Sequence, residues 1–205
     1  ISHGHEDHIG ALPLILRHLS VGVFGTHFTI SLIEDLLTDD GLNIKDYKLY
    51  RINEDKVMTF GNVSVHFFNT SHSLPESIGI AVKTEDGTVV YAPDFTFNVN
   101  TDPRYRTSFT KISDLGKSGT LALLSESLGV NTTHRMQNDA ALIHKITDIL
   151  QHSKRVIFSL FSTDLDRIQK IINVSVQNNR RVAVLGRKAQ RIINIAMTSG
   201  YLKIP

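Results

Sequence analysis

The 205-residue sequence contains no cysteine and no tryptophan, and only five of its residues are proline. Without cysteine there can be no disulfide bonds and no thiolate metal ligands, so a metal ion would have to be bound by histidine and carboxylate side chains. A chain without cysteine suits a reducing compartment, and we expect a cytoplasmic protein. No apolar run approaches the roughly 20 residues that span a bilayer, and the N-terminus has neither the basic nor the apolar region of a signal peptide.

What is present is typical of a globular protein. With 41% hydrophobic and 20% charged residues, the chain can bury a core in one or two domains. Its first residue is isoleucine, and a dense polar motif follows at once. We therefore expect the chain to be a fragment of a longer protein.

The charged residues are unevenly distributed. Residues 151–205 contain ten Lys/Arg and two acids, a net charge of +8, whereas residues 1–150 have a net charge of −6. An acidic region followed by a basic one favours attraction of a polyanion to the C-terminal part, although a solvated charged face explains the pattern equally well.

Local patterns predict helices and hairpins in the first part of the chain. Helical periodicity covers 9–19 and 29–37. β-Rich segments separated by glycine-containing turns predict two successive hairpins in a mostly antiparallel sheet. The expected strands are 56–60, 63–68, 78–84 and 88–91, after a short strand at 21–24.

After residue 118 the pattern changes to strands that alternate with helices. The expected order is strand 120–125, helix 139–150, strand 155–161, helix 164–176, strand 181–185 and helix 187–197. Such alternation is typical of βαβ units with a parallel sheet. The polar stretch 128–138 is the predicted boundary between two domains, 1–130 and 131–205.

The segment ISHGHEDHIG places four metal-competent side chains within six residues: His3, His5, Asp7 and His8. Zinc prefers imidazole nitrogen and carboxylate oxygen. In a turn between a strand and a helix, His3 and His5 could hold one ion while Asp7 and His8 hold its neighbour. Two further candidates, His72 and Asp94, follow predicted strands. Each alone is more often a turn residue, but beside the first motif both become expected ligands.

The HGHEDH motif, followed by a lone histidine and then a lone aspartate, resembles the metallo-β-lactamase superfamily. The later segments LLSES, VIFSLFSTDLDRIQKII and RRVAVLGRKAQRII resemble the β-CASP insertion of the ribonuclease J family. The resemblance covers essentially the whole chain. It implies an α/β fold of the α+β kind, in which a partial αββα metallo-β-lactamase sandwich is followed by part of a β-CASP parallel α/β domain.

The resemblance also implies roles for seven residues. His3, His5 and His72 would bind the first zinc, Asp7 and His8 the second, and Asp94 would bridge the two. Asp7 and Glu126 would be catalytic, Asp7 by orienting or deprotonating the attacking water and Glu126 as the first acidic motif of the β-CASP family. A further histidine motif of the family is not in the chain, so we expect an incomplete second site and little activity.

The implied function is a zinc-dependent ribonuclease that acts as a 5′–3′ exonuclease and endonuclease in RNA processing and decay. RNA is the implied partner, and the protein would form a homo-oligomer or a hetero-oligomer with a paralogous ribonuclease. Three departures resemble the less active second paralogue of the family: Glu126 replaces the usual Asp, Pro93 the usual Gly, and Asn98 an expected acid. Two alternatives stay open, namely a degenerate RNA-binding or partner subunit and another hydrolase of the same fold. The basic segment 151–205 disfavours another hydrolase of the same fold.

Overall fold

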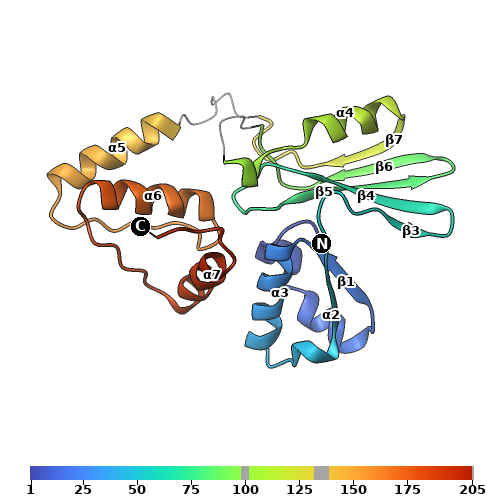
Figure 1. The fold of residues 1–205 in the computed structure, drawn as a ribbon, viewed down its shortest axis with the longest axis horizontal. Coiled ribbons are helices and arrows are strands. Elements are labelled where there is room, and N and C mark those ends of the chain that lie inside the picture. The colour runs from blue at the N-terminus through green and yellow to red at the C-terminus, as the bar shows by residue number, and fades with distance from the viewer. Residues whose placement is uncertain (98–101, 132–138, 205) are drawn as a thin grey trace. The chain divides into compact units, whose positions relative to one another are not determined.

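The computed structural model describes residues 1–97, 102–131 and 139–204. The chain forms two compact units, Ile1–Val130 and Asn131–Pro205, which are described separately below (Figure 1). Their assignment to a metallo-β-lactamase and a β-CASP domain stays a prediction. None of the helices in the described ranges combines the length and hydrophobicity needed to cross a bilayer.

A five-stranded sheet forms the larger part of the first unit (Figure 1). Its strands, in spatial order, are β3 (Met58–Phe60), β4 (Val63–Asn69), β5 (Ile78–Thr84), β6 (Gly87–Ala92) and β7 (Thr120–Ser125). The pairs from β3 to β6 are antiparallel and β7 is parallel to β6, which confirms both hairpins. The first hairpin turns at Gly61, whose φ of 58° lies in the region that glycine adopts without strain.

A small helical layer completes the first unit. Helix α3 (His27–Asp39) buries Phe28, Ile30 and Ile33 completely, and it contacts a two-stranded parallel sheet of β1 (Gly22–Gly25) and β2 (Lys48–Arg51). Helix α4 (Phe109–Lys117) packs Ile112 and Leu115 against the core of the large sheet. The unit also contains the 3₁₀ turns η1 (Ile44–Asp46) and η2 (Pro103–Tyr105). Strand β2 was not predicted, because four residues with one partly buried side chain carry no alternation signal.

The helix predicted over 9–19 is wrong in its extent. The chain instead forms α1 (Glu6–Ile9) and α2 (Leu12–His18), separated by Gly10 and Ala11. Pro13 has no N–H to donate inside a helix but is tolerated in a first turn, so a new helix begins just before it. As a result Asp7 and His8 lie inside a helix, whereas His3 and His5 precede it.

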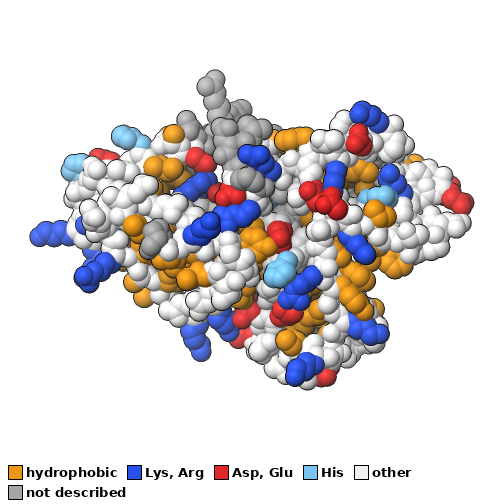
Figure 2. Space-filling model, viewed as in Figure 1, with side chains coloured by type: hydrophobic (Ala, Val, Ile, Leu, Met, Phe, Trp, Pro, Cys, Tyr) orange, Lys and Arg blue, Asp and Glu red, His pale blue; other side chains and the backbone are white. Residues whose placement is uncertain are grey.

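The second unit contains the three predicted helices, α5 (Asp139–His152), α6 (Leu165–Gln177) and α7 (Arg187–Thr198). Helices α5 and α6 share an apolar core that includes Ile146 and Ile171. On the visible face of these helices, Lys and Arg side chains outnumber acidic ones (Figure 2).

The strands predicted at 155–161 and 181–185 are wrong, because neither segment forms a strand in the described part of the chain. In the first segment the period of two is nevertheless real. Val156, Phe158 and Leu160 pack against the helical core, whereas Ile157 and Phe161 are more than four-fifths exposed. A strand also needs a hydrogen-bonded neighbour, and no periodicity supplies one. Of the strands predicted after residue 118, β7 alone forms in the described residues, and it pairs in parallel with β6 of the first unit.

Candidate metal centre

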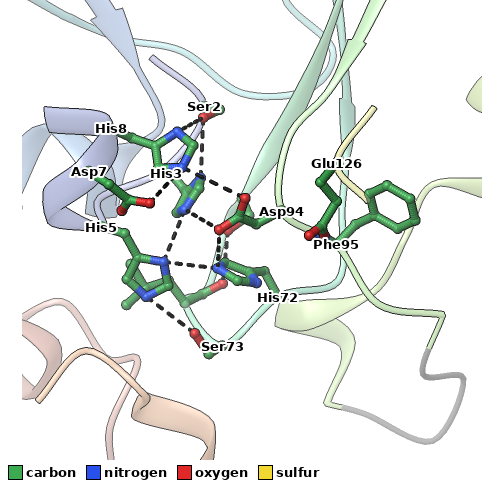
Figure 3. Close-up of polar contacts among 12 residues, drawn as sticks. Ser2, His3, His5, Asp7, His8, His72, Ser73, Asp94, Phe95 and Glu126 are labelled. Atoms are coloured by element: carbon green, nitrogen blue, oxygen red, sulfur yellow. Dashed lines mark hydrogen bonds and ion pairs between the residues drawn. The ribbon is translucent and has the colours of Figure 1, made fainter. Parts of the chain in front are cut away.

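Six side chains from three separate chain segments converge at one place (Figure 3). Two come from the segment before α1, two from α1 itself, one from the loop after β4 and one from the loop after β6. They are His3, His5, Asp7, His8, His72 and Asp94. The structure therefore brings together all six residues that the sequence predicted as ligands. Their ligand role itself stays a prediction.

Four of these residues form what we call the inner group: His3, His5, His72 and Asp94. His5 Nδ1 lies 3.0 Å from His3 Nε2 and 2.9 Å from His72 Nε2. Asp94 Oδ2 lies 3.7 Å from His3 Nε2 and 3.6 Å from His72 Nε2. The side chain of His3 is completely buried and that of His72 is 16% exposed. Three imidazole nitrogens and one carboxylate oxygen thus face one point.

Asp7, His8 and Asp94 form the outer group. His8 Nε2 lies 3.5 Å from Asp7 Oδ2 and 3.7 Å from Asp94 Oδ1. Asp94 therefore directs one oxygen to each group, which is the arrangement that a bridging carboxylate requires. The side chain of Asp7 is 74% exposed, so this group opens to solvent.

Two of the inner histidines, His3 and His72, are held in the neutral form. Burial and the neighbouring rings of His72, His8 and His5 lower the pKa of His3 to about 2. Burial and the His5 ring lower the pKa of His72 to about 4, although Asp94 acts in the opposite direction. A neutral imidazole keeps a lone pair that can bind a cation. The donor set, the neutral rings of His3 and His72, and ligand atoms that all lie within 4.8 Å of one another fit a metal ion of the kind that binds nitrogen and oxygen.

Two serine hydroxyls contact these rings on the sides that face away from the centre (Figure 3). Ser2 Oγ lies 3.2 Å from His3 Nδ1 and 3.5 Å from His8 Nδ1. Ser73 Oγ lies 3.3 Å from His5 Nε2. Neither serine was among the candidate site residues predicted from the sequence. The only available signal was that each directly adjoins a nominated histidine in the chain.

The loops that carry His72 and Asp94 are joined to each other. Thr96 N–H donates to Ser71 O at 2.7 Å, and Ser71 N–H donates to Thr107 Oγ1 at 3.0 Å. Ser71 is almost completely buried. These bonds hold the backbone directly before His72 and two residues after Asp94.

Glu126 lies directly after β7 and accepts a hydrogen bond from the backbone N–H of Phe95, the residue after Asp94 (Figure 3). It is outside both ligand groups found in the described residues. Its predicted catalytic role stays a prediction. Pro93 directly precedes Asp94, and Asn98 lies outside the described residues.

The α/β architecture and this histidine- and aspartate-lined centre are those of a metal-binding protein. The chain belongs to the beta-lactamase superfamily, whose domain model matches residues 1–112. The model of the ribonuclease J beta-CASP domain matches residues 153–205. Membership of this superfamily implies that the chain binds metal.

Individual relatives agree with both matches. Ribonuclease J2 of Bacillus subtilis is 36% identical over 204 residues, which cover 99% of this chain and 37% of that protein. Ribonuclease J 2 of Staphylococcus epidermidis is 33% identical over 206 residues, again 37% of its length. The chain thus spans little more than a third of these curated relatives. A protein of unknown function from Enterococcus faecalis has the same fold over the whole chain, with a TM-score of 0.66 at 18% identity, and the match covers 49% of that structure.

Proposed function

We propose that the protein is a zinc-dependent ribonuclease that hydrolyses RNA phosphodiester bonds from a 5′ end and internally, in RNA processing and decay. One observation carries the proposal: six His and Asp side chains converge in a chain whose later part matches the ribonuclease J beta-CASP domain. The net charge of +8 over residues 151–205 supports RNA as the substrate, because phosphate contacts supply most non-specific affinity for nucleic acid. We place this activity in the cytoplasm.

In this proposal each ligand group binds one metal ion. The inner group would hold one zinc ion and the outer group a second, with one oxygen of Asp94 directed to each. Zinc at such a site supplies Lewis acidity and lowers the pKa of bound water towards neutrality. Because Asp7 is the most exposed member, its carboxylate can reach an incoming water, orient it and accept its proton.

The test uses the longest form of the protein that contains this chain, loaded with zinc and mixed with a 5′-monophosphorylated single-stranded RNA. We expect cleavage that is lost in Asp7→Asn, because the amide accepts a proton poorly. Asp86→Asn, a change in the exposed turn between β5 and β6, is the matched control and should retain activity. Intact RNA after incubation with zinc-loaded protein would refute the proposal.

A second candidate function is a weakly active paralogue that mainly binds RNA or a partner ribonuclease subunit. The position of Glu126 favours it, since that carboxylate is engaged with the Phe95 N–H instead of facing the ligand groups. In this case zinc-loaded protein would bind the RNA in a filter assay without cutting it. Oligomers with itself or with a paralogous ribonuclease would then be the functional form.

A further inference from the structure

Ser2 occupies a central position behind the ligand cluster. It is 4% exposed, and its carbonyl accepts the backbone N–H of Ile78 at 3.0 Å, which anchors it to β5. Its hydroxyl lies between the Nδ1 atoms of His3 and His8, whose ring centroids are 4.0 Å apart. His3 belongs to the inner group and His8 to the outer group, so this one hydroxyl contacts a member of each.

The opposite nitrogens of the same two rings face the shared carboxylate. His3 Nε2 and His8 Nε2 each lie 3.7 Å from an oxygen of Asp94. A neutral histidine that binds a cation through Nε2 must carry its proton on Nδ1. In a buried site that N–H needs an acceptor, and a hydroxyl oxygen has two lone pairs with which it can accept two such bonds.

His5 provides an internal comparison. Its Nδ1 faces the centre, 2.9 Å from His72 Nε2, and its Nε2 contacts the hydroxyl of Ser73. This ring is therefore in the opposite orientation, and its serine contacts no member of the outer group in the described residues. Ser2 is shared between the groups, whereas Ser73 serves the inner group.

We propose that Ser2 is a positioning residue for both metal sites, because its hydroxyl accepts the Nδ1–H of His3 and of His8 and so fixes the tautomer that presents Nε2 to each ion. The inference deepens the zinc-binding function proposed above and rests on it. It predicts that loss of this one hydroxyl weakens the binding of both ions.

The experiment compares Ser2→Ala with Ser73→Ala and Ser77→Ala in the whole chain. Ser77 is a matched control, since it is equally buried and its hydroxyl donates to Leu74 O outside the cluster. Metal-free protein is titrated with zinc against a chromogenic chelator. We expect Ser2→Ala to weaken both ions by roughly 10–100-fold, the usual effect of losing an outer hydrogen bond to a metal ligand. Ser73→Ala should weaken the inner ion alone, and Ser77→Ala neither.

A second measurement is independent of zinc. Long-range ¹H–¹⁵N NMR spectra of the metal-free chain report which ring nitrogen of each histidine carries the proton. The proposal requires His3 and His8 to change from an Nδ1–H form to a mixture in Ser2→Ala, and His5 to change only in Ser73→Ala.

Unchanged tautomers in Ser2→Ala, a loss confined to one ion, or an equal loss in Ser77→Ala would each overturn the role of Ser2 while leaving the ribonuclease proposal intact. A wild-type chain that takes up no zinc would instead refute the zinc function, and the tautomer spectra would still decide for or against Ser2.

Discussion

The inner and outer ligand groups share Asp94 but are built differently. The inner group takes its histidines from two distant chain segments, and His3 within it is completely buried. The outer group takes Asp7 and His8 from one four-residue helix, and Asp7 is largely in solvent. A buried group assembled across the core exists only when the unit is folded, so binding an ion there stabilises the fold. We expect the inner ion to be held tightly and the outer ion weakly.

Removing one ligand from each group should show the largest difference. His72→Ala should lower inner-ion affinity by more than the roughly 100-fold limit seen for residues that only contact a ligand, because it deletes a ligand atom itself. Asp7→Ala should release the outer ion and leave the inner one. Metal content per chain after desalting, measured by mass spectrometry, checks both. Loss of the inner ion in Asp7→Ala would show that the groups are not separable.

The second-largest effect should be the pH dependence of the stability of the metal-free chain, to which His72 of the inner group contributes. Burial lowers the pKa of His72 from 6.5 to about 4, so the unfolded chain binds its proton first. The free energy of unfolding is therefore unaffected by this ring above pH 6.5. It decreases as the pH falls from 6.5 towards 4, because the unfolded chain binds the proton and the folded chain does not. The expected slope is about 1.4 kcal/mol per pH unit for such a histidine.

Urea unfolding with a chelator at pH 7 and pH 5 measures this slope. His72→Gln should reduce it, whereas His152→Gln, which alters a side chain that is 75% exposed, should not. Equal slopes in wild type and His72→Gln would contradict the prediction.

The features predicted correctly from sequence depend on residues that are near one another in the chain. The hairpin at Gly61 is one such feature, and the proximity of His3, His5, Asp7 and His8 to one another is a second, although their ligand role stays a prediction. His72 and Asp94 were nominated because each follows a strand, which places them at one edge of the sheet.

The features that were missed depend on partners far away in the chain. No local pattern specifies that β1 pairs with β2 or that Glu126 contacts Phe95. Nor does a local pattern reveal that 155–161 has no neighbouring strand with which to pair in the described residues. The contact of Ser2 with His8 is close in sequence, but it depends on the turn that α1 imposes. Tertiary context decides the first three features, and local helix geometry decides the last.

Glu126 offers a smaller effect on both groups, through the loop of Asp94. Glu126→Ala removes the acceptor of the Phe95 N–H and should cost about 1–2 kcal/mol of stability, with modest weakening of both ions. Glu126→Gln retains a carbonyl acceptor and should preserve most of both. Urea unfolding and zinc titration measure these changes. If Glu126 is catalytic as the sequence predicts, Glu126→Gln would lose RNA cleavage while its stability and zinc content stay near wild type.

The smallest expected effect comes from Thr70, in the loop that carries the inner ligand His72. Its hydroxyl is buried and has no hydrogen-bond partner in the described residues, whereas the equally buried Thr29 hydroxyl pairs with Thr26 Oγ1 at 2.9 Å. Replacing an unpaired buried hydroxyl by a methyl group removes a desolvation cost, so Thr70→Val should leave stability unchanged or raise it by up to about 1 kcal/mol. Thr29→Val should instead cost about 1 kcal/mol, because it leaves the Thr26 hydroxyl without that bond. Urea unfolding of the two variants measures the contrast, and zinc affinity should stay at the wild-type value in Thr70→Val. A destabilised Thr70→Val with weaker inner-ion binding would mean that this hydroxyl helps to hold the His72 loop, and the inner group would then have a further polar support beside Ser2 and Ser73.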